Sequence, residues 1–327
     1  MNHILFLLII IFSSSFTNSA LAAKKKVQKV INQDITNISF INFKTNVKKV
    51  VIKKNNISSV DNFIVPDNFK TFVYEDNNTE SINGLVLNEA LVKLSLYNNE
   101  IGSLKNISFN SNIKYIDLGS NQINDLSEID LSGSNVKQLI VARNSIQTLN
   151  GLILNESLEK IFFNSNQLDN INNFNFPSSL KTLSFTLNEL KTFNGALIND
   201  NLEVLQIGGN DFNSYSDIVN LPNNLKILVL GSLVTPTDFT GLQLPDSLIR
   251  LNIGLTLANQ EDFATLTLPS KLKAIDFSQN QISSLDGLSF PNTLRKLDLS
   301  NNPISKEERR KIKRRFKREN PKLKIKF

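Results

Sequence analysis

Residues 91–101 read LVKLSLYNNEI, and residues 113–123 repeat the same frame as IKYIDLGSNQI. Apolar residues occupy the first, fourth, sixth and eleventh positions of both stretches, and asparagine occupies the ninth. Copies spaced 22 to 24 residues apart begin at Val47, Phe69, Leu91, Ile113, Val136, Leu158, Leu180, Leu202, Leu225, Leu248, Leu272 and Leu294. Self-similarity at this period indicates a solenoid of stacked coils.

The middle of each frame predicts a short strand. Side chains alternate along a strand, so Leu94 and Leu96 should point inward and Ser95 outward. One coil of about 22 residues cannot bury its own leucines, whereas stacked coils bury them continuously. We therefore expect one parallel strand per coil around a shared core.

Asparagine at the ninth position has a structural explanation. The chain turns sharply there and leaves backbone N–H and C=O groups inside, and a buried amide can satisfy both kinds of group. The expected asparagine ladder consists of Asn99, Asn121, Asn144, Asn166, Asn188, Asn210, Asn280 and Asn302. The copies at Leu225 and Leu248 instead carry Leu233 and Thr256, with Gly231 and Gly254 at outward positions. Local drift, a bend and a second contact site are the alternatives there, and we favour drift.

Over residues 47–304 the sequence resembles the leucine-rich-repeat family. The phrases LDLSNNPI and IDLGSNQI are similar to secreted bacterial repeats of the internalin kind, and GLQLPDSL, FNFPSSL and LSFPNTL resemble the Leu-Pro repeats of bacterial effectors. The resemblance implies a β-dominated α/β fold, a right-handed horseshoe solenoid with a parallel concave sheet. Some Leu-Pro effectors are ubiquitin ligases that need a catalytic Cys, and this chain has no Cys. That activity therefore does not carry over.

The segments between strands carry proline at Pro177, Pro222, Pro245, Pro269 and Pro291. Proline cannot continue a helix, so the convex side should be extended or 3₁₀. Ser305 and Glu308 form a capping-box pattern that predicts a helix to about Arg318, followed by a strand after Pro321. This basic segment, residues 305–327, is the expected C-terminal cap.

The first residues predict an export signal. An apolar run from Ile4 to Phe12 precedes small residues, which indicates a signal peptide over residues 1–22 and a secreted, periplasmic or surface-associated protein. An uncleaved anchor is the alternative, but nine apolar residues are too few to cross a bilayer of roughly 30 Å. Residues 23–46 are then an N-terminal cap, in which Ile35, Ile38, Phe40 and Phe43 would form an irregular first rung with Phe43 at the asparagine position. We expect no integral membrane segment after removal of the signal.

Composition excludes most catalytic chemistry. The chain has no Cys, and its one His, His3, lies in the predicted signal. Nucleophilic and general-base chemistry on those residues is therefore excluded from the mature chain. We expect no enzyme activity, metal or cofactor, and hydrolysis by Asp117, Asp276 and Asp298 is the alternative.

Outward positions of the strands should form the binding surface. The predicted partner-binding residues are Tyr97, Tyr115, Ile140, Arg143, Lys160, Phe162, Val204, Ile227 and Val229. Ile140 and Phe162 could reflect β-propensity alone, or they could be the centre of an interface ringed by aromatic and Arg anchors. We favour the interface, and we expect a monomer that binds another protein.

Both ends of the chain are basic. Residues 24–70 hold ten Lys and Arg against three acids, and residues 306–327 hold twelve against three. A solvated cap is the simpler interpretation, and anion binding by Arg310, Lys313, Arg314 and Lys317 is the second. Nucleic acid is not expected, because base-reading side chains are not interleaved with these charges.

Overall fold

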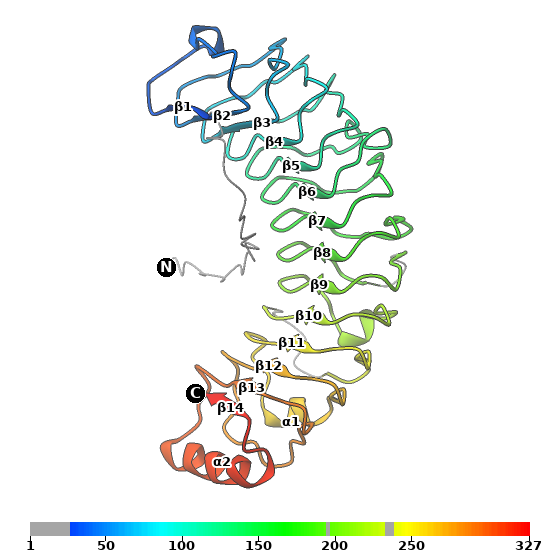
Figure 1. Ribbon diagram of the computed structural model, residues 1–327. Helices are drawn as coiled ribbons and strands as arrows, with labels where there is room; N and C mark the ends of the chain where they lie inside the picture. The colour runs from blue at the N-terminus through cyan, green and yellow to red at the C-terminus, as the bar shows by residue number, and fades with distance from the viewer. Residues whose placement is uncertain (1–26, 194–196, 233–238) are drawn as a thin grey trace.

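The computed structural model describes residues 27–193, 197–232 and 239–327. The predicted signal peptide, Lys24–Lys26 and Leu233 lie outside the described residues. A curved solenoid carries one parallel sheet along its inner side (Figure 1). Its strands, which neighbour one another in chain order, are β1 (Val27–Ile31), β2 (Lys49–Lys53), β3 (Thr71–Glu75), β4 (Lys93–Ser95), β5 (Tyr115–Asp117), β6 (Gln138–Ile140), β7 (Lys160–Phe162), β8 (Thr182–Ser184), β9 (Val204–Gln206), β10 (Ile227–Val229), β11 (Arg250–Asn252), β12 (Ala274–Asp276), β13 (Lys296–Asp298) and β14 (Lys324–Lys326).

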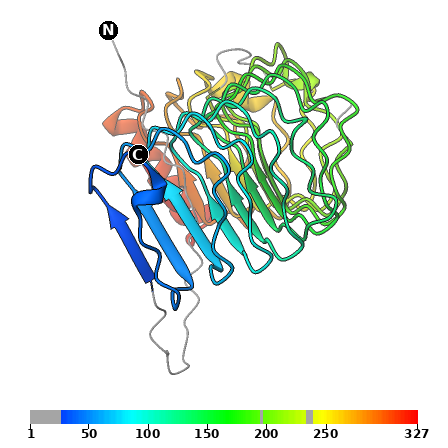
Figure 2. The same ribbon diagram turned by 90° about the horizontal axis from the view of Figure 1, so that it is seen from above.

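The strands stack in the register of the repeat frame. Leu94 pairs with Ile116, which in turn pairs with Leu139, so equivalent positions form straight columns across the sheet. Viewed along the stack, successive strands run in the same direction (Figure 2). The twelve copies found in the sequence correspond to β2 through β13. The predicted leucine-rich solenoid is therefore confirmed.

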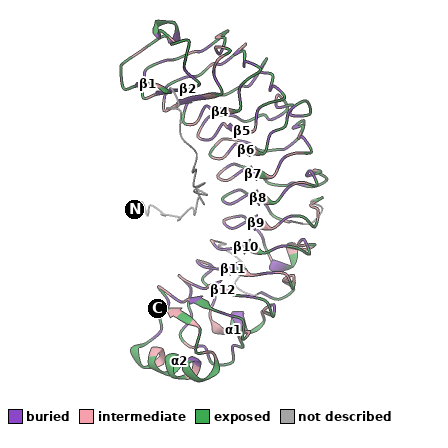
Figure 3. Ribbon diagram, in the orientation of Figure 1, coloured by how far each residue is buried: buried purple, intermediate pink, exposed green. Residues whose placement is uncertain are grey.

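The core is a continuous column of apolar side chains. Leu94 and Leu96 are 0% exposed, as are their counterparts Ile116 and Leu118 in the next coil. Figure 3 shows buried positions in coil after coil along the stack. Burial of one such side chain contributes about 1.5–3 kcal/mol, and each coil gains it only from its neighbours.

The asparagine ladder is confirmed. The side-chain amide of Asn121 donates to Leu96 O and Leu118 O, both at 3.0 Å, and its Oδ1 accepts from the Ile101 N–H at 3.1 Å. One side chain therefore links two coils through backbone groups that would otherwise be buried without partners. Asn55 and Asn77 extend the ladder toward the N-terminus.

The diverged copies are held differently. Thr256 takes the asparagine position, and both its N–H and its hydroxyl donate to Asn280 Oδ1 at 2.9 Å. A Cβ atom on Gly208 would lie 2.1 Å from Gly231 O, and one on Gly231 would lie 2.4 Å from Gly254 O. Neighbouring backbones therefore approach too closely for a side chain there, which gives the outward glycines a structural reason.

The N-terminal cap differs from the expectation. The first rung is β1, which pairs with β2 and places Gln33, not Phe43, in the asparagine column. Gln28 stands where a core residue is expected and instead bonds to Asn42 O and the Lys44 N–H. The predicted first rung is thus the return segment of this coil. Ile38 there is buried, while Phe40 is 72% exposed.

The convex side is largely irregular, as predicted. It carries two 3₁₀ turns, at Ile38–Phe40 and Tyr215–Asp217, and one short α-helix, α1 (Gln260–Ala264). Prolines begin several turns that lead into strands, as where the Leu225 N–H donates to Pro222 O at 3.1 Å. The short helix follows one of the diverged copies, where the coil is longest.

The last coil is covered by α2 (Lys306–Glu319), as predicted. Ile312 and Phe316 are buried on its inner face, and Ser305 caps its first turn. Arg315 donates to Leu285 O and Leu288 O, both at 2.9 Å, which satisfies carbonyls of the preceding coil. Among the described residues, no helix is both long and apolar enough to span a membrane.

Candidate partner-binding face

The inner face presents three outward columns, formed by the third, fifth and seventh positions of each frame. At the fifth position, Asp117, Ile140, Phe162 and Ser184 lie on four successive strands and pair in direct register. Neighbouring strands in a sheet lie about 4.8 Å apart, so side chains of one column contact one another. The sequence-predicted residues therefore fall into groups that the register defines.

Ile140 and Phe162 lie directly opposite each other on β6 and β7. Both are half-buried. Lys160, on the same strand as Phe162, is exposed beside them. These three form the central patch, in which an apolar pair borders a cation.

Val204, Ile227 and Val229 form a second group, the distal patch. Val204 pairs with Ile227 across β9 and β10, and all three side chains are half-buried. Thr182 and Ser184 on β8 separate them from the central patch. The predicted apolar residues therefore make two patches rather than one continuous surface.

Arg143 does not lie on a strand. It occupies the turn after β6 with φ of +57°, and its side chain is exposed. The eighth position of the frame is left-handed in many copies, including Asn98 and Ser120. Arg143 therefore borders the concave face at the end of β6.

Tyr115 belongs to a polar cluster near the N-terminal end. The Lys93 ammonium lies 4.0 Å from the centroid of the Tyr115 ring, and the tyrosine hydroxyl donates to Asp117 at 3.1 Å. The Tyr115 side chain is thus fixed from both sides. Tyr97, which follows β4, is half-buried at the seventh position of the preceding rung.

Partial burial shapes the electrostatics of this cluster. It raises the pKa of Asp117, an effect that the Gly119 N–H and the Tyr115 hydroxyl partly offset. It also lowers the pKa of Lys93, although Glu75 and Asp117 counteract this. Glu75 forms an ion pair with Lys53 and accepts a hydrogen bond from Ser95. Opposite charges in this cluster therefore satisfy one another within the protein.

The carboxylates considered for hydrolysis also form hydrogen bonds or ion pairs with neighbouring side chains. Asp276 pairs with Asp298 across β12 and β13, and Asp117 lies far away on β5. Asp276 accepts from Asn252 at 3.1 Å, and Asp298 binds Lys326 at 2.9 Å. No group of three or more Asp, Glu, His or Cys residues within 27–193, 197–232 and 239–327 is arranged to hold a metal.

On the C-terminal helix the proposed anion-binding residues are Arg310, Lys313, Arg314 and Lys317, all exposed. Lys313 Nζ lies 5.5 Å from the centroid of the Phe327 ring. Arg314 and Lys317 line a surface depression together with Glu308, Glu319 and Asp286. Acids thus share this surface with the bases.

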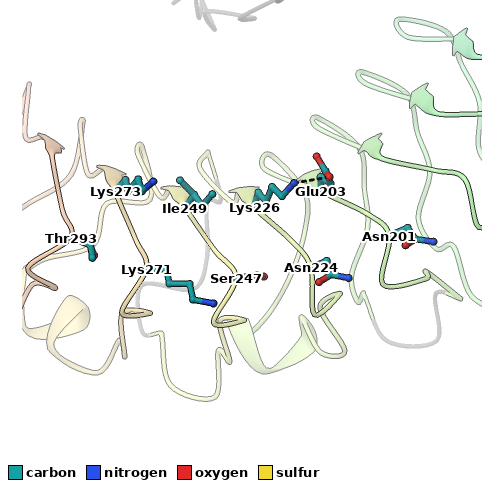
Figure 4. A pocket seen from close by; sticks show the side chains of 9 residues that line it. All are labelled: Asn201, Glu203, Asn224, Lys226, Ser247, Ile249, Lys271, Lys273 and Thr293. Atoms are coloured by element: carbon teal, nitrogen blue, oxygen red, sulfur yellow. Dashed lines mark hydrogen bonds and ion pairs between the residues drawn. The ribbon is translucent and has the colours of Figure 1, made fainter.

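Sequence reasoning missed a flank of the sheet. Position two of the frame, just before each strand, is basic in eight of the twelve copies, as at Lys48 and Lys70. A shallow groove of about 440 Å³ follows this flank beside β9 to β13 (Figure 4). The basic residues at position two were visible in the sequence, but this position lies outside the apolar and asparagine pattern that defines the frame.

Comparison with known proteins agrees with this geometry. Residues 270–308 match the family Leucine Rich repeats (2 copies), and residues 109–127 match the family Leucine Rich repeat. No curated protein matches the chain by sequence.

Solved structures share the fold. An internalin (InlF) from Listeria monocytogenes is 21% identical with a TM-score of 0.61, covering 92% of this chain and 86% of that one. The leucine-rich effector YopM from Yersinia pestis is 20% identical with a TM-score of 0.55, covering 88% and 79%. The functional domain of InlJ, also from Listeria monocytogenes, is 18% identical with a TM-score of 0.55, covering 86% and 64%. Together with the stacked strands and the asparagine ladder, these matches show that the chain contains leucine-rich repeats and folds as a leucine-rich-repeat solenoid like that of the internalins.

Proposed function

We propose that the chain is an exported, non-catalytic protein that binds another protein through its concave face, with the central patch as the main contact. Solenoids of this kind commonly serve as protein-interaction modules, because their curvature presents one extended surface. The observation that carries the proposal is the direct pairing of Ile140 with Phe162 on the inner face. Neither side chain is needed for the core, which lies on the opposite side of the sheet.

The chemistry of the patch fits a protein partner. Half-buried aromatic and aliphatic side chains that border cations are typical of interface centres, where water is excluded around a few anchors. Tyr115, held rigid by Lys93 and Asp117, loses little freedom on binding. Arg143 and Lys160 add charge at the rim, where it influences association more than final affinity.

The test compares two Phe→Asp variants. We would capture partners on the immobilised chain and measure the dissociation constant of the captured protein for each variant. Phe162→Asp should weaken binding by roughly a hundredfold, because an aspartate in the centre of an interface costs several kcal/mol. Phe40→Asp is the matched control, because Phe40 is exposed on the return segment of the first coil.

The outcomes separate cleanly. An affinity within twofold of the parent for folded Phe162→Asp would refute the central patch, and an equal loss in both variants would refute a specific site.

Export is tested by a separate measurement. Mass spectrometry of protein released by the producing cell should find a first residue near Ala23.

A second candidate rests on the basic C-terminal helix. Arg310, Arg314 and Lys317 are exposed there, and they would contact an anionic surface. Such binding should weaken steeply as ionic strength rises and should be lost when these residues are neutralised. Binding through the central patch should change little under the same neutralisation.

A further inference from the structure

Charge in the repeats is sorted by position. Residues 47–304 contain 19 Lys and Arg, and 13 of them stand at positions two and three of the frame. The same span contains 26 Asp and Glu, of which only Glu159 and Glu203 stand at those positions. An acidic body therefore carries its bases along one edge of the sheet, where each strand begins.

The basic flank row is defined by position two. Its members are Lys48, Lys70, Lys114, Lys137, Lys181, Lys226, Lys273 and Arg295. Backbone bonds tie consecutive members of this column, as where the Lys70 N–H donates to Lys48 O at 2.8 Å and the Arg295 N–H to Lys273 O at 2.8 Å. The column thus follows the solenoid rung by rung, about 4.8 Å apart.

Most of these cations are available to a ligand. Lys137 pairs with Glu159 at 2.8 Å, and Lys226 pairs with Glu203 at 2.7 Å, both at the surface. Surface pairs of this kind contribute about 0–1 kcal/mol and can be displaced. Lys48, Lys70, Lys114, Lys181 and Lys273 have no ion pair with any residue that the structure describes.

Uncharged polar groups run alongside the row. The groove beside β9 to β13 is lined at position two by Lys226, Lys273, Glu203 and Ile249, and in the neighbouring column by Asn201, Asn224, Ser247, Lys271 and Thr293 (Figure 4). Several members of that column donate hydrogen bonds to backbone carbonyls of the previous coil. The Ser247 hydroxyl, for example, donates to Leu225 O at 2.7 Å. Three lysines in the groove therefore outnumber its one acid, Glu203, and amide and hydroxyl groups lie beside them.

We infer that the basic flank row binds an acidic polysaccharide, an extended chain of sugars bearing carboxylate or sulfate groups. A narrow row with a cation in eight of twelve coils matches a long, thin and flexible polyanion. Polar side chains beside the cations can bond to sugar hydroxyls. This surface is separate from the concave patches, and the inference does not depend on the proposed protein partner.

Other polyanions fit less well. Single-stranded nucleic acid is usually held by aromatic side chains that stack on bases, and none of the twelve copies has an aromatic residue at position two. Seven of the eight members are Lys, a point charge, whereas Arg is the residue suited to bidentate phosphate contacts. A membrane would require a broad basic plane, whereas the column on one side of the row is largely Asn, Ser and Thr, and position three on the other side is basic in only five of twelve copies.

The test measures binding of the full chain to heparin, a sulfated linear polysaccharide, by calorimetry at several salt concentrations. The variant Lys114→Gln, Lys181→Gln, Lys273→Gln removes three cations that are spread along the row and unpaired. Its dissociation constant should rise at least about tenfold, and the slope of log affinity against log salt should fall by about 2, at roughly 0.7 per cation. Uncharged dextran should not bind.

The matched control removes three exposed cations that lie outside the row and outside α2, as Lys54→Gln, Lys105→Gln, Lys191→Gln. It should change the heparin affinity less than about threefold, which separates the row from net charge. An equal loss in both variants, or none in the row variant, would overturn the inference. Tighter, row-dependent binding of an oligothymidylate or of vesicles containing phosphatidylglycerol would overturn it as well, because the occupant would then not be a polysaccharide. Thermal unfolding of both variants checks the fold.

Discussion

The coils from β5 to β9 and the coils of β10 and β11 solve the same packing problem in different ways. In the first group an asparagine in every coil donates to at least two carbonyls and accepts from one N–H, as Asn121 does. In the second group Thr256 replaces the asparagine, and the outward glycines let neighbouring backbones approach closely. Buried backbone groups must be satisfied in both, but only the asparagine does so with a single side chain.

This difference separates two sources of stability. A ladder of amides resists the removal of any one member, because each loss leaves groups unpaired in two coils. A close backbone approach resists the addition of atoms. The two regions should therefore respond to opposite kinds of substitution.

The largest expected effect is in the regular region. Asn188→Leu removes bonds from the side-chain amide to Phe163 O at 3.0 Å and Phe185 O at 2.9 Å, and one from the Leu168 N–H at 3.1 Å. Leaving those groups buried and unpaired should cost about 3 kcal/mol. Thr256→Val, which loses only a hydroxyl, should cost about 1 kcal/mol. Urea unfolding of both variants measures this, and equal losses would erase the proposed contrast.

Addition of a methyl group should have the next largest effect. Gly231→Ala places a Cβ 2.4 Å from Gly254 O and should destabilise the chain by about 2 kcal/mol through backbone strain. Gly102→Ala is the control, because no atom lies within 4 Å of its added Cβ. It should change the free energy of unfolding by about 0.5 kcal/mol or less. A stable Gly231→Ala variant would show that the coils can separate without cost.

Removal of the hydroxyl from two buried tyrosines should change the stability of the protein in different directions. The Tyr74 hydroxyl bonds to Thr79, whereas the Tyr215 hydroxyl has no partner among the described residues. Burial raises the pKa of both. Tyr74→Phe should destabilise by about 1 kcal/mol, and Tyr215→Phe should be neutral or stabilising by about 1 kcal/mol. Thermal denaturation would contradict this expectation if both variants lost stability equally.

The smallest effects concern two aspartates on the inner face. The folded state holds the pKa of Asp117 above its usual value, so any stabilisation by this group is present at low pH and is lost as pH rises through the folded pKa. Partial burial alone would raise the pKa of Asp298. Hydrogen bonds from Lys326 and Ser300 have a larger combined effect in the opposite direction, so the pKa of Asp298 is lowered overall. Its stabilisation is present at neutral pH and is lost as pH falls.

Asn variants should therefore behave oppositely between about pH 3 and pH 7. Relative to the parent, Asp117→Asn should gain stability as pH rises, and Asp298→Asn should lose stability. Each change should be about 1 kcal/mol or less, because both sites are partly solvated. Parallel pH profiles in urea unfolding would show that the two environments are equivalent.

Much of the fold can be predicted from the sequence because the spacing of residues within the repeat frame is nearly constant. Leucine at fixed spacing defines the core, and asparagine at the ninth position defines the turn, so twelve coils could be counted directly. The cap at β1 was missed because Gln28 and Gln33 replace the apolar and asparagine positions that identify a coil. Their roles depend on bonds to Asn42, Lys44 and Asn55, which no local pattern reveals.

The inner face was predictable in part. Outward positions follow from alternation, yet the separation of the two apolar patches depends on Thr182 and Ser184 between them. The contact of Lys93 with Tyr115 could have been found, because both occupy the third position of adjacent frames. The flank row lies outside the strands, where alternation does not predict direction, so only the structure shows that its members are exposed, apart from the half-buried Lys114.

The most direct measurement is photocrosslinking from the central patch. A photoreactive phenylalanine analogue at position 162 keeps an aromatic ring on β7, and the same analogue at position 40 lies on the return segment of the first coil. If the concave face binds a protein partner, the partner should crosslink at position 162 and not at position 40. Crosslinking at position 40 alone, with none at position 162 in a complex that still forms, would contradict binding through the concave face.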